Sequence, residues 1–136
     1  MNLVSIRIIT TDVKKLVAFY SEITGLAAVQ LTEDFAELQT KWATLAIGST
    51  RTLHFFGGDE VSAAAQNKTA IIEFITKDVD AEYDRLLNFI EPYLIQKPIT
   101  MPWGNRSLLF RDPDGNLVNF FTPVSADAIK KFKKTI

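Results

Sequence analysis

The chain has 136 residues, the length of one ordinary domain, and its 47% hydrophobic content is usual for a soluble globular protein. Its 15 basic and 16 acidic residues give a formal net charge of -1, which gives no electrostatic case for binding nucleic acid. The chain has no cysteine, no apolar run long enough to span a membrane and no signal-peptide pattern, so we expect a cytoplasmic protein without disulfides, cysteine-based zinc sites or membrane contact.

The first half of the chain predicts a strand, a helix and about three more strands. Residues 3–9 are apolar and β-branched, and Thr10–Asp12 predicts a helix N-cap, not a catalytic group. Apolar residues then recur at helical spacing until Gly25, which predicts a left-handed helix end. Residues 26–40 and 42–56 predict the other strands, with Gly48–Thr50 as the tightest turn signal and residues 53–56 as the last strand. A polar stretch over residues 57–68 joins the halves.

The second half repeats this order. Residues 69–76 predict a strand, Asp78 or Asp80 predicts a helix N-cap, and residues 93–96 predict a strand before an aromatic-bearing loop or edge at residues 98–104. Residues 107–111 and 116–122 predict a hairpin across Asp112–Gly115, which lacks the later acidic ligands of a calcium loop. Residues 126–134 predict a short amphipathic helix, and we interpret its lysines as a solvated helix end rather than a contact with a partner.

The two halves are copies of one unit. Ser5–Val13 aligns with Ile71–Val79, and we align Leu53–Phe56 with Val118–Phe121 through their phenylalanine pairs. The uneven alternation of strands and helices favours an α+β fold with mixed sheets over a doubly wound parallel sheet. We predict one domain over residues 1–136, with module one at about 1–57, module two at about 68–123 and a terminal helix at about 126–134. A shared cleft between the copies is then the expected place of function.

The sequence resembles the vicinal oxygen chelate superfamily, which holds glyoxalase I enzymes, extradiol dioxygenases and bleomycin resistance proteins. The motifs that carry the resemblance are Ile8–Val13, Ala18–Tyr20, Thr24–Leu26, Asp78–Ala81 and, above all, Pro102–Ser107 running into Phe110–Asn116. The resemblance implies paired βαβββ modules that form an open, cup-shaped mixed sheet, and commonly a homodimer.

Metal enzymes of this superfamily place ligands, usually His, Glu or Gln, on the first and last strand of each module. Carried over position by position, these ligands fall on Ser5, His54, Ile71 and Asn119. Ile71 cannot ligate, and Ser5 and Asn119 are weak neutral ligands, whereas a divalent ion needs about three good donors. We therefore predict no metal and no cofactor, so glyoxalase I and dioxygenase activity do not carry over.

Three residues of the predicted cleft have two interpretations each. His54 is the only histidine. In the functional interpretation it contacts a ligand or acts as a general base, and in the structural one it is a partly buried imidazole that hydrogen-bonds a neighbour. Arg7 and Glu73 occupy the same position in the two copies, and alternation along their strands turns both away from the helices. They either form an ion pair with each other, or Arg7 holds an anionic ligand through its planar guanidinium.

Aromatic and amide side chains near residue 103 complete the predicted site. Trp103 either rims the ligand site or packs in the core or a dimer, and Trp42, in the region taken as its counterpart, is expected to pack. Asn105 and Arg106 either add polar contacts to the ligand or shape the loop. We predict ligand contacts from these six side chains: Arg7, His54, Glu73, Trp103, Asn105 and Asn119.

Three hypotheses for function follow. The first is a metal-independent small-molecule binding protein of the bleomycin-resistance type, which takes an apolar or aromatic ligand in the cleft. The second is a metal-free isomerase, epimerase or lyase with His54 as the base and Arg7 or Asn119 steadying an oxyanion. The third is a protein whose cleft is filled by its own side chains and which works through protein contacts.

Overall fold

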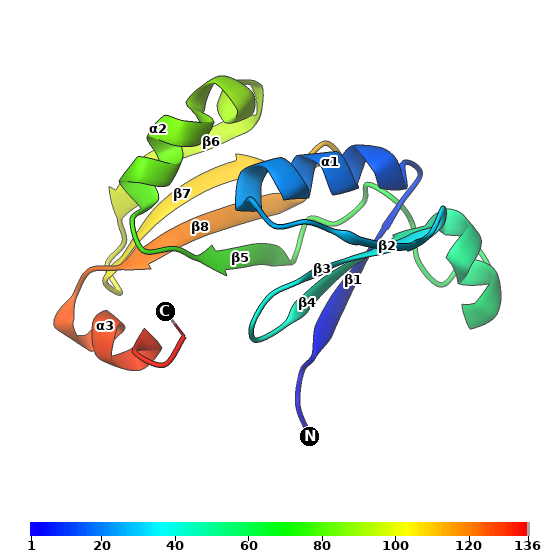
Figure 1. The fold of residues 1–136 in the computed structure, drawn as a ribbon, viewed down its shortest axis with the longest axis horizontal. Coiled ribbons are helices and arrows are strands. Elements are labelled where there is room, and N and C mark those ends of the chain that lie inside the picture. The colour runs from blue at the N-terminus through cyan, green and yellow to red at the C-terminus, as the bar shows by residue number, and fades with distance from the viewer. Residues whose placement is uncertain (136) are drawn as a thin grey trace. The chain divides into compact units, whose positions relative to one another are not determined.

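The computed structural model describes residues 1–135 (Figure 1). The chain forms two compact units: Met1–Asn67 with Pro113–Gly115 make unit 1, and Lys68–Asp112 with the chain from Asn116 onward make unit 2. Each unit holds a mixed four-stranded sheet and a long helix, so the predicted α+β fold with tandem βαβββ modules is confirmed. Within the described residues, no helix is long and apolar enough to cross a membrane.

Unit 1 follows the predicted order of elements up to residue 49. The elements of unit 1 are β1 (Ser5–Thr10), α1 (Val13–Thr24), β2 (Val29–Thr32), β3 (Phe35–Gln39), β4 (Thr44–Ser49) and the 3-10 helix η1 (Thr50–Phe56). The strand order is β1-β4-β3-β2, with β1 parallel to β4 and the other pairs antiparallel. α1 lies along one face of this sheet (Figure 1).

Local signals set the limits of α1, and burial holds it on the sheet. Asp12 Oδ1 accepts a hydrogen bond from the Lys15 amide over 3.1 Å, and Gly25 ends the helix with a left-handed φ of 69°. The apolar stripe of the helix is buried against the sheet side chains of β3 and β4; it consists of Val13, Leu16, Phe19, Tyr20 and Ile23, facing Ala36, Leu38, Leu45 and Ile47. Each large side chain buried in this way contributes about 1.5–3 kcal/mol.

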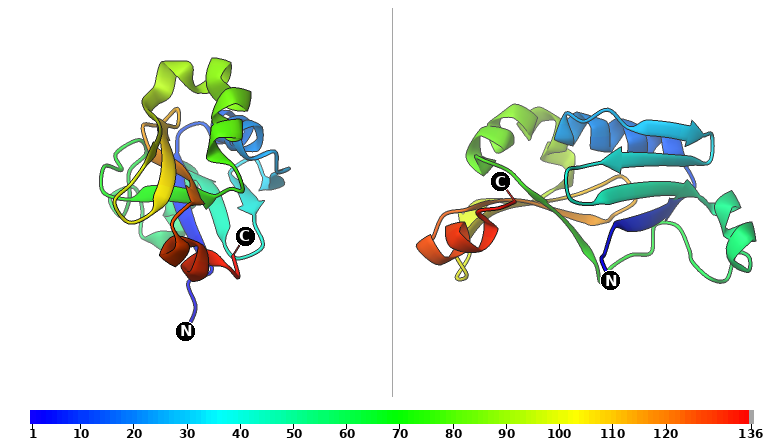
Figure 2. Two further views of the ribbon diagram at one scale, coloured as in Figure 1. Left: turned by 90° about the vertical axis from the view of Figure 1, so that its left-hand side faces the viewer. Right: turned by 60° about the horizontal axis from the view of Figure 1, so that its bottom comes forward.

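Unit 2 repeats the arrangement and adds a helix. Its elements are β5 (Ile71–Ile75), α2 (Val79–Ile90), the 3-10 helix η2 (Glu91–Tyr93), β6 (Leu94–Thr100), β7 (Asn105–Arg111), β8 (Leu117–Pro123) and α3 (Ala126–Phe132). The order β5-β8-β7-β6 matches unit 1, and β5 runs parallel to β8. α2 packs on one face of this sheet, and α3 lies at the end of β8 (Figure 2).

The capping prediction for α2 is confirmed at Asp78. Its Oδ1 accepts from the amides of Asp80 and Ala81, both over 3.1 Å, so Asp78 rather than Asp80 is the N-cap. The amide of Val79 donates to Thr122 Oγ1 over 2.9 Å, which ties the start of the helix to β8. The apolar side chains beneath α2 are Leu108, Phe110, Val118 and Phe120, all at least 97% buried.

The expected last strand of module one is wrong. Residues 53–56 form the end of η1, while Gly48 and Ser49 belong to β4 and make no turn between strands. Ser49 Oγ accepts from the Arg51 amide over 3.2 Å, and Gly57 ends η1 with a left-handed φ of 104°. These two caps favour a helical turn in a segment whose side chains alone resemble a strand.

The strand registers also correct the alignment of the two copies. Arg7 of β1 lies opposite Ala46 of β4, and Glu73 of β5 lies opposite Asn119 of β8. Since Arg7 and Glu73 are equivalent, the counterpart of Asn119 is Ala46 and not His54. The alignment of Leu53–Phe56 with Val118–Phe121 through their phenylalanine pairs is therefore wrong.

Candidate functional site

Each sheet has an open face, which we define as the face turned away from α1 in unit 1 and from α2 in unit 2. In unit 1 the strand positions on this face are Ser5, Arg7 and Ile9 of β1, Thr44, Ala46 and Gly48 of β4, and Phe35, Glu37 and Gln39 of β3. In unit 2 they include Ile71, Glu73, Ile75, Ser107, Leu109, Leu117, Asn119 and Phe121. The prediction that Arg7 and Glu73 face away from the helices is confirmed.

Arg7 lies among aromatic rings on the open face of unit 1. Its Cζ is 4.6 Å from the centroid of the Phe35 ring and 5.3 Å from that of Phe56. Contacts of this kind contribute about 0.5–1 kcal/mol at an exposed site, and Arg7 is exposed. Among the described residues of unit 1, none forms an ion pair or a hydrogen bond with the guanidinium. We call Arg7, Phe35 and Phe56 the arginine cluster.

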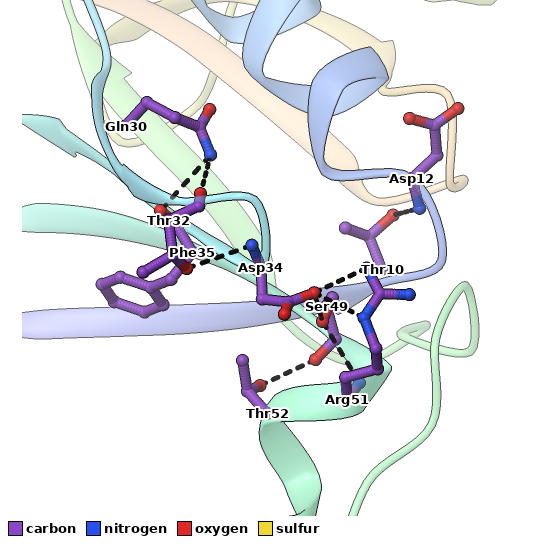
Figure 3. Close-up of polar contacts among 9 residues, drawn as sticks. All are labelled: Thr10, Asp12, Gln30, Thr32, Asp34, Phe35, Ser49, Arg51 and Thr52. Carbon is purple, nitrogen blue, oxygen red and sulfur yellow. Dashed lines mark hydrogen bonds and ion pairs between the residues drawn. The ribbon is translucent and has the colours of Figure 1, made fainter.

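A polar network fixes the two segments that supply these rings (Figure 3). Asp34 Oδ1 accepts from Arg51 Nε and from Ser49 Oγ, both over 2.7 Å. The Ser49 amide also donates to the Asp34 carbonyl over 2.8 Å. Asp34 directly precedes Phe35, and Ser49 and Arg51 lie at the start of η1, which carries Phe56. The network therefore joins the start of β3 to η1.

The charges of this network favour one another. The hydrogen bond from Arg51, followed by that from Ser49, lowers the pKa of the Asp34 carboxyl below its usual range. The same bond to Asp34 raises the pKa of Arg51. Thr52 Oγ1 donates to the Ser49 carbonyl over 2.7 Å and closes the first turn of η1.

Gly48 leaves room for the aliphatic part of Arg7. A Cβ at this position would lie 3.4 Å from Arg7 Cδ and 3.1 Å from Thr52 Oγ1. A glycine inside a strand often marks a close approach of another group to the backbone. Here the two nearest groups are the Thr52 hydroxyl and the Arg7 side chain.

His54 does not occupy the position that the sequence predicted. It lies on η1, its imidazole is exposed rather than partly buried, and it forms no hydrogen bond with the described part of the chain. Its predicted contact with a ligand stays a prediction.

Glu73 and Asn119 form a polar pair on the open face of unit 2. Asn119 Nδ2 donates to Glu73 Oε2 over 2.7 Å. This bond fixes the amide orientation, because the flipped amide would place an oxygen against the carboxylate. Asn119 is 8% exposed, and its Oδ1 has no donor among residues 1–135. The predicted ion pair between Arg7 and Glu73 and the predicted cleft both involve the two units, and they stay predictions.

The positions equivalent to the metal ligands of the family do not fit a metal. The register replaces His54 by Ala46, so the positions hold Ser5 and Ala46 in unit 1 and Ile71 and Asn119 in unit 2. Two of these side chains have no donor atom, and the other two are neutral oxygen donors. No group of three or more His, Cys, Asp or Glu side chains suited to a metal occurs in the described residues.

The two tryptophans are exposed. Trp103, 66% exposed, lies in the turn between β6 and β7, and Trp42, 57% exposed, lies between β3 and β4 with Lys41 Nζ 4.9 Å from its ring centroid. The interpretation that either tryptophan packs in the core of this chain is therefore wrong. The β3–β4 turn corresponds to the β7–β8 turn, so the two tryptophans are not counterparts.

Asn105 and Arg106 point to opposite faces of β7. Arg106 donates from Nε and Nη2 to the carboxylate of Asp80 over 2.6 and 2.8 Å, which lowers the pKa of Asp80 and raises that of Arg106. Arg106 therefore ties β7 to the start of α2. Asn105 lies opposite Pro123, and its buried Oδ1 has no donor among the residues described. Its predicted ligand contact stays a prediction.

Sequence reasoning missed the partners of Arg7. Phe35, Gly48 and Phe56 come from three separate segments, and only the strand register and η1 bring them together. The one signal in the sequence was Gly48, which lies inside an apolar run. A glycine there fits a turn, but it also fits a strand residue that another side chain approaches closely.

Comparison with known proteins agrees with the fold. A model of the Glyoxalase/Bleomycin resistance protein/Dioxygenase superfamily matches residues 2–120. The Bacillus subtilis (strain 168) protein named Uncharacterized protein YraH is 29% identical over 126 residues, 89% of this chain and 98% of that protein. The structure of a glyoxalase/bleomycin resistance protein/dioxygenase family enzyme from Burkholderia phytofirmans PsJN is similar with a TM-score of 0.79 at 16% identity, over 91% of this chain and 100% of the other. A glyoxalase/bleomycin resistance protein/dioxygenase from Nocardioides gives 0.76 at 20% identity, over 93% and 85%. At these identities, the two structures establish the fold alone.

Proposed function

Because the chain belongs to the Glyoxalase/Bleomycin resistance protein/Dioxygenase superfamily, we propose that it binds a small apolar or aromatic molecule without a metal. The observation that carries this proposal is aromatic surface held in place but left uncovered on the open face of unit 1. Phe56 is 59% exposed, Phe35 is half-buried, and both rings contact the Arg7 guanidinium. The caps of η1 and the polar network around Asp34 fix the helix that carries Phe56. Aromatic surface of this kind suits flat ligands.

The metal-independent part of the proposal rests on the donor set. Ser5, Ala46, Ile71 and Asn119 supply no carboxylate, imidazole or thiolate at the family's metal positions. Such a set has too few good donors to displace the hydration shell of a divalent ion.

A ligand-observed NMR screen of aromatic small molecules, run with excess chelator, tests the proposal. We expect bound ligands in chelator and a loss of affinity of about fivefold in Phe56→Ala, because an aromatic contact contributes about 1 kcal/mol. Phe55→Ala is the matched control, since Phe55 lies on the same helix, is 89% exposed and, among the described residues, is not one of the rings that contact the Arg7 guanidinium. Binding that disappears in chelator and returns only with a divalent ion would overturn the proposal.

A further inference from the structure

We propose that Arg7 is a carboxylate-binding residue and that the ligand is a small organic acid, a single carboxylate on a flat apolar body. This inference rests on the proposed function and names the chemical class of its ligand. The guanidinium is exposed on the open face of unit 1, 4.6 and 5.3 Å from the centroids of Phe35 and Phe56.

The donors of Arg7 are unused inside its own unit. Ring contacts engage the positive charge of a guanidinium but accept none of its five N–H groups in the way a carboxylate does. No described residue of unit 1 accepts a hydrogen bond from Arg7 or forms an ion pair with it. The planar N–H fork matches the two oxygens of a carboxylate, and the adjacent rings suit an apolar body attached to that carboxylate.

The one carboxylate at the strand positions of this face is engaged elsewhere. Glu37 is separated from Arg7 by the small side chain of Ala46 in the register of β1, β4 and β3. The two side chains do not form an ion pair: Glu37 Oε2 accepts a hydrogen bond from Gln39 Nε2 over 2.9 Å, and the Arg7 guanidinium contacts the rings. Arg7 is also the only cationic side chain among those nine strand positions, so the face suits a monoanion better than a doubly charged phosphate.

Unit 2 provides an internal comparison, because its equivalent positions contain no such cluster. Glu73 stands where unit 1 has Arg7, Phe121 where it has Gly48, and Ser107 where it has Phe35. Phe121 is 7% exposed, with its ring centroid 5.2 Å from that of Phe132 on α3. The shared backbone therefore does not require the arginine cluster. It arises from the side chains of unit 1.

Asp34 and Arg51 act as positioning residues in this arrangement. They do not touch the proposed ligand, but their ion pair joins the start of β3, which carries Phe35, to η1, which carries Phe56. Gly48 also helps to place Arg7, because a side chain that extends beyond Cβ at this position would displace the Arg7 side chain.

Calorimetric titration with three matched probes tests the inference: benzoate, its neutral isostere benzamide, and phenyl phosphate. We expect benzoate to bind the wild-type protein about tenfold or more tightly than benzamide, because a charge-assisted bidentate contact contributes more than a neutral hydrogen bond. Arg7→Gln is expected to reduce benzoate affinity to the level of benzamide, and Arg7→Lys to leave an intermediate affinity. Arg85→Gln is the control, since Arg85 is paired with Glu82 in unit 2. Unchanged circular dichroism and melting temperature will show that the variants are folded.

The outcomes separate this inference from the proposed function. Equal binding of benzoate and benzamide, unchanged by Arg7→Gln, would overturn the carboxylate inference and leave metal-independent ligand binding standing. Tighter binding of phenyl phosphate than benzoate through Arg7 would also overturn it. No binding of any probe, together with no hit in the aromatic screen, would overturn both.

Discussion

Arg51 donates a hydrogen bond from Nε to Oδ1 of Asp34 over 2.7 Å, across 17 residues of sequence. The bond joins the turn before β3 to the first turn of η1, and these segments hold the two rings around Arg7. An exposed ion pair usually adds little to stability. Here the main effect of the ion pair is to position the segments that carry Phe35 and Phe56. Substitutions in the network should therefore change ligand affinity more than they change the free energy of unfolding.

Asp34→Asn should lower the melting temperature at neutral pH. The bonds from Arg51 and Ser49 lower the pKa of Asp34 in the folded state relative to its usual 3.8. The contribution of Asp34 to stability is therefore complete above pH 3.8 and is lost as the pH falls through the lowered folded value. Melting curves from pH 7 downward should show the two proteins converging in acid. Asp59→Asn, which removes no ion pair seen in the structure, is the control. A difference that persists at the lowest pH would contradict the assignment.

Gly48→Ala and Gly48→Val should separate packing from binding. For alanine, the reduced freedom of the unfolded chain, worth about 0.4–1 kcal/mol, opposes the tight contact with Thr52, so stability should change little. Valine should cost about 1–3 kcal/mol through overpacking. Valine should also weaken benzoate binding by displacing Arg7, whereas alanine should change it little, because its Cβ would lie 3.4 Å from Arg7 Cδ, an ordinary contact distance. Urea unfolding and calorimetry measure the two effects, and unchanged affinity in the valine variant would show that Gly48 does not seat Arg7.

Gly104→Ala should destabilise the protein more than Gly115→Ala. Both glycines have a left-handed φ, 89° and 83°, which costs an alanine about 1–2 kcal/mol. At Gly104 the new Cβ would also lie 1.9 Å from Ser125 Oγ, the atom that caps α3, whereas at Gly115 it would meet nothing within 4 Å. Urea unfolding should show the excess cost at Gly104. Equal losses of stability in the two variants would mean that Ser125 and the start of α3 can move away from the new Cβ without a loss of stability.

Asn119→Leu should be neutral or stabilising. Asn119 is buried and its Oδ1 has no donor among the described residues, a state that costs about 1–3 kcal/mol. Its exposed partner Glu73 can take a hydrogen bond from water instead. Asn119→Asp should destabilise at neutral pH, because it places a second carboxylate beside Glu73. Denaturant unfolding of both variants is the measurement. A loss above about 1 kcal/mol in the leucine variant would mean that Oδ1 has a donor in solution.

His54→Ala tests the alternative of a metal-free isomerase, epimerase or lyase. Because the imidazole is exposed and forms no described hydrogen bond, stability should stay within about 0.5 kcal/mol. A binding protein should show no turnover before or after the substitution and a modest change in affinity. Turnover of any ligand from the screen that falls by orders of magnitude in this variant would establish the enzyme instead.

Signals that act within a few residues predicted most of the fold. Asp12, Gly25 and Asp78 are caps whose effect is local, and the alternation of strand residues correctly placed Arg7 and Glu73 on the face away from the helices. The prediction of secondary structure was wrong where two local tendencies competed. Residues 53–56 have strand-like side chains, but the caps at Ser49 and Gly57 favour η1.

The candidate site was harder to predict, because its members meet through strand pairing over long sequence distances. Arg7, Phe35 and Phe56 share no motif, and a match of residue types aligned His54 with Asn119 although Ala46 occupies that register. Hydrogen-bonded register determines equivalence in a repeated sheet, and similarity of side chains does not.

The repeat also gives the protein a reference built into its own chain. Gly48 and Phe121 stand at the same place on the same backbone, one beneath an arginine and the other beneath α3. A Gly48→Phe substitution would thus copy into unit 1 a residue that unit 2 already accommodates. Engineers who wish to fill the first surface at Gly48, or to open the second at Phe121, can take the replacement residue from the equivalent position in the opposite unit.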